Sequence, residues 1–136
     1  MIARVRKSMQ EKDQGFTLVE LLVVIIIIGI LSAIAIPVFM NQRKKAVDSG
    51  IKSDLRTIAN EMETYYIDYQ VYAGSAAKNV ATIGTATTST VTVNASDDDT
   101  VFTITGGAND FVVTGTNSTK GTGDTYTYDS DAGGLQ

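Results

Sequence analysis

The chain has 136 residues, a formal net charge of −4, and neither cysteine nor histidine. Without cysteine it can form no disulfide and offer no thiolate, and without histidine it lacks the commonest general base. Any zinc ion would have to be held by carboxylates alone. The composition therefore argues against a disulfide-stabilised domain and against the usual zinc or histidine-dependent enzymes.

The first segment, residues 1–15, has no apolar periodicity and is predicted to be a targeting leader that takes no part in the fold. Its basic residues exceed its acidic ones by two, so the rest of the chain carries −6. Lysine and arginine close to a membrane span tend to stay in the cytoplasm. We expect the leader to be cytoplasmic and the acidic C-terminal part to cross the membrane.

The second segment, residues 16–40, is predicted to be a hydrophobic transmembrane helix. No charged residue occurs from Leu21 to Gln42, and leucine, isoleucine and valine dominate the run. At about 1.5 Å per residue, a helix of this length crosses the ~30 Å hydrocarbon core of a bilayer. A helix that is apolar on every face belongs in a membrane or inside a helical bundle.

Three residues distinguish this segment from a simple anchor. Glu20 is a lone carboxylate at the edge of the apolar run, which is costly unless a cationic group meets it. Pro37 lacks an N–H group, and Gly29 weakens the helix further. We expect a partner for Glu20, and a kink or a locally melted segment near Gly29 and Pro37.

The sequence Gly15-Phe16-Thr17-Leu18-Val19-Glu20, with basic residues before it and the apolar run with its proline after it, resembles the class III signal of type IV prepilins and pseudopilins. The resemblance covers roughly residues 1 to 45. It implies cleavage between Gly15 and Phe16 by prepilin peptidase, a membrane-embedded aspartic peptidase, followed by N-methylation of Phe16. Glycine before the cut would let the backbone approach the protease closely.

The same resemblance gives Glu20 a role in assembly, namely pairing with the freed α-amino group of Phe16 on its own chain or on a neighbour. A low dielectric strengthens such a pair and could fix the register of subunits. A simpler interpretation of Glu20 is a glutamate that reaches the membrane interface.

The prepilin interpretation of the N-terminus also has a competitor. Ala33-Ile34-Ala35 resembles the cleavage site of an ordinary secretory signal, which would be cut after Ala35.

Residues 41–73 are predicted to be the amphipathic half of the same helix. Apolar residues recur there at spacings of three and four, as in a helix with one buried stripe. Gly50 is expected to be a second position, after Gly29 and Pro37, at which the helix can bend. The expected stripe consists of Val47, Ile51, Leu55, Ile58, Met62, Tyr65 or Tyr66, and Tyr69.

The tyrosines near the end of this helix are interpreted as core residues with polar tips. Acidic residues surround them, whereas a nucleic-acid platform would interleave lysine or arginine. No nucleic acid is therefore predicted as a partner.

Residues 74–136 are rich in threonine, glycine, asparagine and valine, which predicts an antiparallel β-sheet region. The fold class expected is α+β, with the long helix packed against a small sheet as in pilins. Residues 74–88 and 115–123 are expected to be loops, and Gly106–Asn109 a hairpin connection. The predicted strands are Ser89–Ala95, Thr100–Thr105, Asp110–Thr114 and Thr125–Tyr128, and their apolar residues Val91, Val93, Phe102, Ile104, Phe111, Val113, Tyr126 and Tyr128 are expected to cover the helix stripe.

Clustered aspartates raise the possibility of a calcium site, because hard cations bind carboxylates. The first cluster, Asp97–Asp99, lacks EF-hand spacing and fits a turn. The weak candidates for a metal are Asp124, Asp129 and Asp131. No cofactor is predicted, and no catalytic constellation is present, so the chain is expected not to be an enzyme.

The leading hypothesis is a structural subunit of a type IV pilus. The precursor would span the cytoplasmic membrane once and then join an extracellular helical homopolymer, driven by an assembly machinery with an inner platform and an ATPase. The alternatives are a pseudopilin of a type II-like secretion or DNA-uptake system and a membrane-anchored surface domain that does not polymerise.

Overall fold

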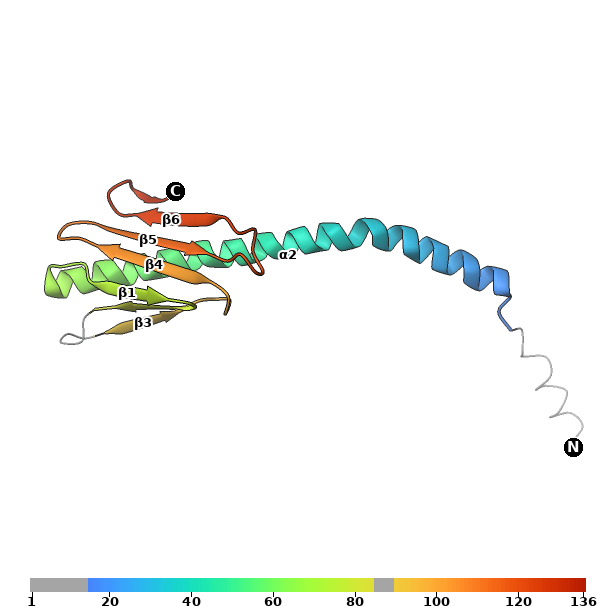
Figure 1. Cartoon of the computed structure of the whole chain (residues 1–136), viewed down its shortest axis with the longest axis horizontal. Helices are drawn as coiled ribbons and strands as arrows, with labels where there is room; N and C mark the ends of the chain where they lie inside the picture. Colours follow the sequence, from blue (N-terminus) through green and yellow to red (C-terminus); the bar gives the residue numbers. More distant parts are fainter. Residues whose placement is uncertain (1–14, 85–89) are drawn as a thin grey trace, which may run out of the picture. The chain divides into compact units, whose positions relative to one another are not determined.

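The computed structural model describes residues 15–84 and 90–136. The chain divides into two compact units, Met1–Phe39 and Met40–Gln136. Helix α2 (Leu18–Tyr69) is 52 residues long, forms the first unit's described secondary structure and continues as the helix of the second (Figure 1). Of the predicted leader, only Gly15 is among the described residues.

The end of α2 is set by Gln70, which adopts a left-handed conformation with φ of 55°. Its side-chain amide donates a hydrogen bond of 3.1 Å to the carbonyl oxygen of Tyr66, one of the last carbonyls of the helix. The helix therefore stops at Tyr69, before the expected limit at residue 73.

Seven strands follow α2 and form two antiparallel sheets. The first sheet has the order β1 (Gly74–Ala77), β2 (Val80–Ile83), β3 (Val91–Asn94). The second has the order β4 (Val101–Gly106), β5 (Phe111–Thr116), β6 (Thr125–Asp129), β7 (Gly134–Leu135). A bridge between Lys78 and Val101 joins the two sheets. The predicted α+β class, a long helix with antiparallel strands, is confirmed.

The four predicted strands overlap β3, β4, β5 and β6, although Ser89 at the start of the first lies outside the described residues. The predicted hairpin connection is also confirmed: Gly106 pairs with Phe111, and the Gly107 N–H donates to the Asp110 carbonyl at 2.8 Å. Short polar loops rich in glycine close such hairpins readily.

The expectation that residues 74–88 form a loop is wrong, because β1 and β2 make a hairpin within them. Glycine, serine and alanine are poor strand formers, so local propensity gave no sign of β1. β1 is stabilised by pairing with β2. β2 is in turn held in the core by Ala81 and Ile83, which are fully buried. Asn79, at φ of 55°, forms the tight turn.

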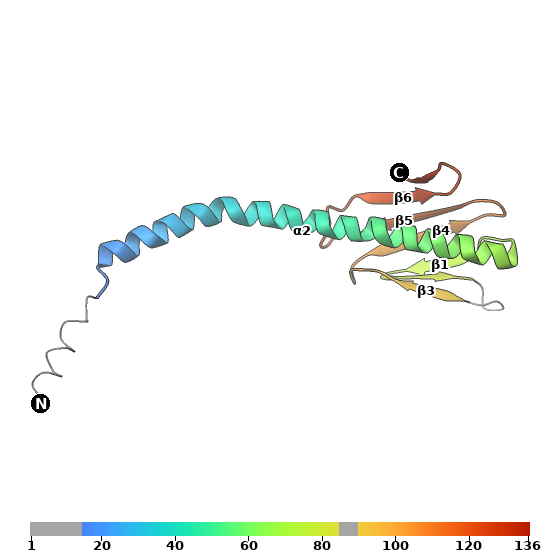
Figure 2. The same cartoon turned by 180° about the vertical axis from the view of Figure 1, so that it is seen from behind.

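The core lies between the second half of α2 and the two sheets. Figure 2 shows this half of α2 crossing in front of β4 and β5. Gly115 lets the strand approach the helix closely, because a Cβ atom there would lie 2.7 Å from Cγ2 of Ile51. The buried apolar side chains come from both layers: Ile51, Leu55, Ile58, Ala59, Met62, Tyr65, Tyr72, Ala81, Ile83, Phe102, Phe111 and Val113.

Two residues expected in this core are exposed instead. Tyr69 is 41% exposed, because it lies in the last turn of the helix; its ring is tilted against that of Tyr65, with centroids 4.5 Å apart. Val91 is 39% exposed, because β3 is an edge strand. Periodicity predicted which face of each element is apolar but not where the covering layer ends.

Tyr65 and Tyr72 are buried in the core and Tyr66 packs against it, as predicted, whereas Tyr69 is not. The Tyr72 ring lies between Tyr66 and Phe111, with centroids 4.4 and 4.8 Å away. Its hydroxyl donates a 3.0 Å hydrogen bond to Glu63. Burial, followed by this carboxylate, raises the pKa of Tyr72 above its ordinary value.

Candidate processing and assembly site

The N-terminus of α2 is built as a capping box. Oε2 of Glu20 accepts hydrogen bonds from the Thr17 N–H at 2.9 Å and from the Thr17 hydroxyl at 2.7 Å. In return, the Glu20 N–H donates to the Thr17 hydroxyl oxygen at 3.2 Å. Threonine and glutamate three residues apart are the residue types that this motif requires. The sequence thus starts the helix directly after Gly15 and Phe16.

Glu20 therefore already has a local partner in the uncleaved chain. Both Thr17 donors reach the same carboxylate oxygen, Oε2. Cleavage after Gly15 would turn the Phe16 nitrogen into an α-amino group, one residue before the N–H that Glu20 binds. The predicted pairing of that amino group with Glu20 is thus compatible with the local geometry, and it stays a prediction.

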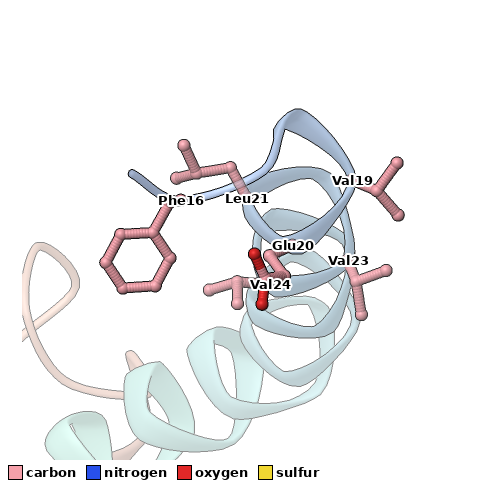
Figure 3. Close-up of a pocket in the computed structure, with 6 residues that line it drawn as sticks. All are labelled: Phe16, Val19, Glu20, Leu21, Val23 and Val24. Atoms are coloured by element: carbon pink, nitrogen blue, oxygen red, sulfur yellow. The ribbon is translucent and has the colours of Figure 1, made fainter. Parts of the chain in front are cut away.

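A hollow open to solvent lies at this helix start, with a volume of about 650 Å³. Figure 3 shows the Phe16 ring and the Glu20 carboxylate on one side of the helix, with Val24 one turn beyond Glu20, while Val19 and Val23 project from the other side. The lining is apolar except for the glutamate. Its residues are Phe16, Val19, Glu20, Leu21, Val23 and Val24.

The apolar side chains of the first unit are exposed all round. Phe16 is 85% exposed, Leu31 62% and Phe39 65%, and no residue of the most apolar 18-residue window is buried. In the part of the chain that the structure describes, α2 is the one helix long and apolar enough to cross a membrane. Nothing within the described chain covers this surface.

Gly29 and Pro37 lie inside this stretch, and α2 runs through both without interruption. A Cβ atom on Gly29 would meet nothing within 4 Å, so packing does not explain this glycine. A weak point at these two residues is still a prediction about assembly.

Two buried aspartates of α2 were missed by the sequence reasoning. Asp48 accepts hydrogen bonds from the N–H and hydroxyl of Thr122, at 3.1 and 2.8 Å. Asp54 accepts them from the N–H and hydroxyl of Ser96, at 2.8 and 2.6 Å. Their helical spacing, which places both beside the apolar stripe, was the available signal. Each fixes a loop of the β region to the helix.

The acidic turn Asp97–Asp99 is neutralised by lysines. Lys120 Nζ lies 3.2 Å from Asp97 and 3.1 Å from Asp99, and Lys78 Nζ lies 2.8 Å from Asp99. The Asp99 N–H, then Lys120 and Asn117, lower the pKa of Asp97, while Lys78 and then Lys120 lower the pKa of Asp99. The two carboxylates raise the pKa of Lys120.

The three candidate metal ligands do not gather into one site. Asp124 Oδ2 lies 2.9 Å from the Thr122 hydroxyl, whereas Asp129 accepts the N–H groups of Asp131 and Ala132 in the turn before β7. Within residues 15–84 and 90–136, no three carboxylates are arranged to hold a metal ion.

Comparison with known proteins agrees with this site. The family described as "Prokaryotic N-terminal methylation motif" matches residues 11–36. No solved structure matches the chain.

Three relatives represent two kinds of protein. The chain is 37% identical over 62 residues to "Type II secretion system core protein G" of Escherichia coli, covering 46% of this chain and 43% of the relative. It is 42% identical over 64 residues to "Type IV wide pilus major component PilA4" of Thermus thermophilus, covering 47% and 49%. It is 36% identical over 62 residues to "Type IV major pilin protein PilA" of Myxococcus xanthus, covering 46% and 28%.

The matched regions thus span less than half of each relative's length. The methylation motif spans Gly15, Phe16 and the capping pair Thr17 and Glu20. The N-terminal half of the chain is thus similar to type IV pilins and pseudopilins, and it carries the methylation motif.

Proposed function

We propose that this chain is a structural, non-catalytic subunit of a type IV pilus, polymerised through the N-terminal half of α2. The observation that carries the proposal is the exposed apolar surface of residues 16–40, next to Glu20 in its capping box. Such a surface is stable only in a bilayer or against other apolar helices. A membrane-stored precursor and a filament provide these two environments in turn.

In this proposal residues 1–15 are the leader, and prepilin peptidase cuts between Gly15 and Phe16. Phe16 is then N-methylated. Its new amino group pairs with Glu20 of its own chain or of a neighbour and aligns the incoming subunit. Gly29 and Pro37 let the helix bend or melt during transfer from the membrane. An inner platform and an ATPase drive that transfer, and the strands of residues 74–136 remain on the outside of the filament.

The experiment is N-terminal sequencing combined with mass measurement of purified surface filaments. We expect a mature chain that begins with methylated Phe16. Retention of Met1, or Ile36 as the first residue, would contradict the proposal, and Ile36 would support an ordinary secretory signal.

Glu20→Ala tests the assembly step, with Asp68→Ala as the matched control because Asp68 is an exposed carboxylate of the same helix outside residues 16–40. We expect Glu20→Ala to accumulate in the membrane and to form few filaments, while Asp68→Ala assembles normally. Unchanged surface display of Glu20→Ala would favour the anchored domain that never polymerises.

The second candidate, a pseudopilin of a type II-like secretion or DNA-uptake system, is favoured by the similarity to type II secretion system core protein G. Electron microscopy of sheared surface material separates the two candidates. Long fibres that contain this chain support the pilus, and a chain that is processed but never found in long fibres supports the pseudopilus.

A further inference from the structure

A small basic cavity lies at the point where α2 leaves its apolar stretch. It has a volume of about 110 Å³ and is lined by Met40, Arg43, Lys44, Thr119 and Lys120. All five residues belong to the unit Met40–Gln136. A water molecule takes about 30 Å³ in the liquid, so the cavity has room for a group of several heavy atoms.

The positive charge at this cavity is uncompensated. Arg43 and Lys44 are exposed, and neither forms an ion pair within the described ranges 15–84 and 90–136. Lys120 differs, because its ammonium group is already bound by Asp97 and Asp99. Arg43 and Lys44 therefore supply the free cations of the cavity.

Nearby acidic residues do not cancel these cations. Asp48 and Asp54, which follow in the same helix, direct their carboxylates to Thr122 and Ser96. Asp97 lines a neighbouring hollow together with Arg43, but its carboxylate is bound by Lys120, and the Asp99 carboxylate is bound by Lys120 and Lys78. An anion from outside the chain is therefore the available partner for Arg43 and Lys44.

The position along the helix indicates which anion. Met40 ends the apolar stretch, and Arg43 follows three residues later, about 5 Å further along the helix axis. A basic residue this close to the end of a membrane span reaches the depth of the lipid headgroups, and basic clusters there attract anionic lipids. The guanidinium of Arg43 is also suited to bidentate contact with a phosphate group.

We propose that this basic cavity binds the headgroup phosphate of an anionic phospholipid, on the membrane side opposite the leader. Arg43 and Lys44 bind the phosphate oxygens, the Thr119 hydroxyl donates a further hydrogen bond, and Met40 forms the apolar wall. The inference rests on the membrane-stored precursor of the proposed function. The phosphate contact would hold the subunit at the membrane in addition to the apolar helix. It would have to break when the subunit leaves the membrane.

The test uses the full chain in a mild detergent, mixed with phosphatidylglycerol or with phosphatidylcholine, and native mass spectrometry to count the lipids retained. We expect the unaltered chain to retain phosphatidylglycerol preferentially. Arg43→Gln should reduce this retention several-fold. The matched control is Arg56→Gln, since Arg56 is an exposed arginine of the same helix without an ion pair in the described ranges, and it should leave retention unchanged.

Equal retention of the two lipids, or equal losses in Arg43→Gln and Arg56→Gln, would overturn the proposal. Inorganic phosphate that displaces phosphatidylglycerol at equal concentration would show a site for free phosphate instead of a lipid. Weakened self-association of Arg43→Gln with unchanged lipid retention would assign the cavity to a contact with a second copy. Lys44→Gln repeats the measurement if the circular dichroism of Arg43→Gln shows altered folding.

This experiment is independent of the filament assay. Arginine-dependent retention of phosphatidylglycerol by a chain that never forms fibres would leave the lipid site standing and remove only the proposed function. Normal fibres from a chain without lipid preference would support the proposed function and remove only the lipid site.

Discussion

The two halves of α2 have the same backbone conformation and opposite surroundings. Leu31, in the first half, is 62% exposed, whereas Leu55, in the second, is fully buried. The second half packs one apolar stripe against the two sheets and leaves its polar face to solvent. Its apolar side chains are therefore covered by the same chain. The first half is apolar on every face and finds no partner among the described residues. In the proposed function, a bilayer and then other subunits cover this half.

The carboxylates of the two halves differ in the same way. Glu20 binds Thr17, three residues away, and this contact caps the helix. Asp48 and Asp54 bind Thr122 and Ser96, which are distant in the sequence and belong to loops of the β region. A local carboxylate sets where the helix begins, and the long-range ones attach the strands to it.

The largest expected effect on stability comes from comparing the same kind of substitution, leucine to alanine, in each half. Leu55→Ala should lower the free energy of unfolding by about 2–5 kcal/mol, because it removes buried methyl groups and leaves a cavity. Leu31→Ala, at an exposed position, should change it by less than about 0.5 kcal/mol. Urea unfolding in detergent, followed by tyrosine circular dichroism, measures both. Equal effects would show that the first half also packs within its own chain.

The buried carboxylates should have the next largest effect. Asp54→Ala removes the acceptor for the Ser96 N–H and hydroxyl and should cost about 1–3 kcal/mol. Hydrogen exchange at the Ser96 amide should accelerate markedly. Asp68→Ala, which removes an exposed carboxylate of the same helix, is the control and should leave that exchange rate unchanged. An unaltered Ser96 amide in Asp54→Ala would contradict this attachment.

Glycine substitutions sharpen the comparison further. Gly115→Ala should destabilise the second unit by about 1–3 kcal/mol, because the new Cβ would lie 2.7 Å from Ile51 and 3.3 Å from Phe102. Gly29→Ala meets no neighbour within 4 Å and should instead raise helix stability slightly. Thermal unfolding and far-ultraviolet circular dichroism measure the two effects. A stabilising Gly115→Ala would mean that β5 can move away from the helix.

The smallest effect concerns pH. The folded-state pKa values of Asp97 and Asp99 lie below the ordinary 3.8, so their stabilisation is complete above that value and is lost as pH falls through the lower folded pKa values. The pKa of Lys120 is raised above the ordinary 10.5, so its contribution to folding stability is complete below that value and is lost as pH rises through the folded pKa. Lys120→Met should therefore flatten the acid limb of the stability profile, measured as urea midpoints from pH 5 to pH 2.

Lys45→Met provides the control for the pH profile, because Lys45 is exposed and has no ion pair within the described ranges. An acid limb of equal steepness in the unaltered chain and in Lys120→Met would show that these carboxylates contribute nothing to acid stability.

The apolar stretch could be predicted because it needs only a count of residue types. The capping pair Thr17 and Glu20 was not predicted, although its signal is local and lies within one helical turn. The strands β4, β5 and β6 likewise carry their own alternation or β-branched residues. The hairpin β1–β2 could not be found this way, because Gly74–Ala77 becomes a strand only through pairing with Val80–Ile83.

The sequence by itself determined which half of α2 is apolar all round and that the N-terminal part resembles type IV pilins and pseudopilins, since both depend on neighbouring residues. Only the tertiary structure decided that Asp48 and Asp54 are buried attachments, that Lys120 neutralises Asp97 and Asp99, and that Arg43 and Lys44 line a cavity with Thr119. Each of these depends on loops that lie far along the chain from their partners. Long-range hydrogen bonds and ion pairs leave no periodic trace in a sequence, because the chain has to fold before the partners meet.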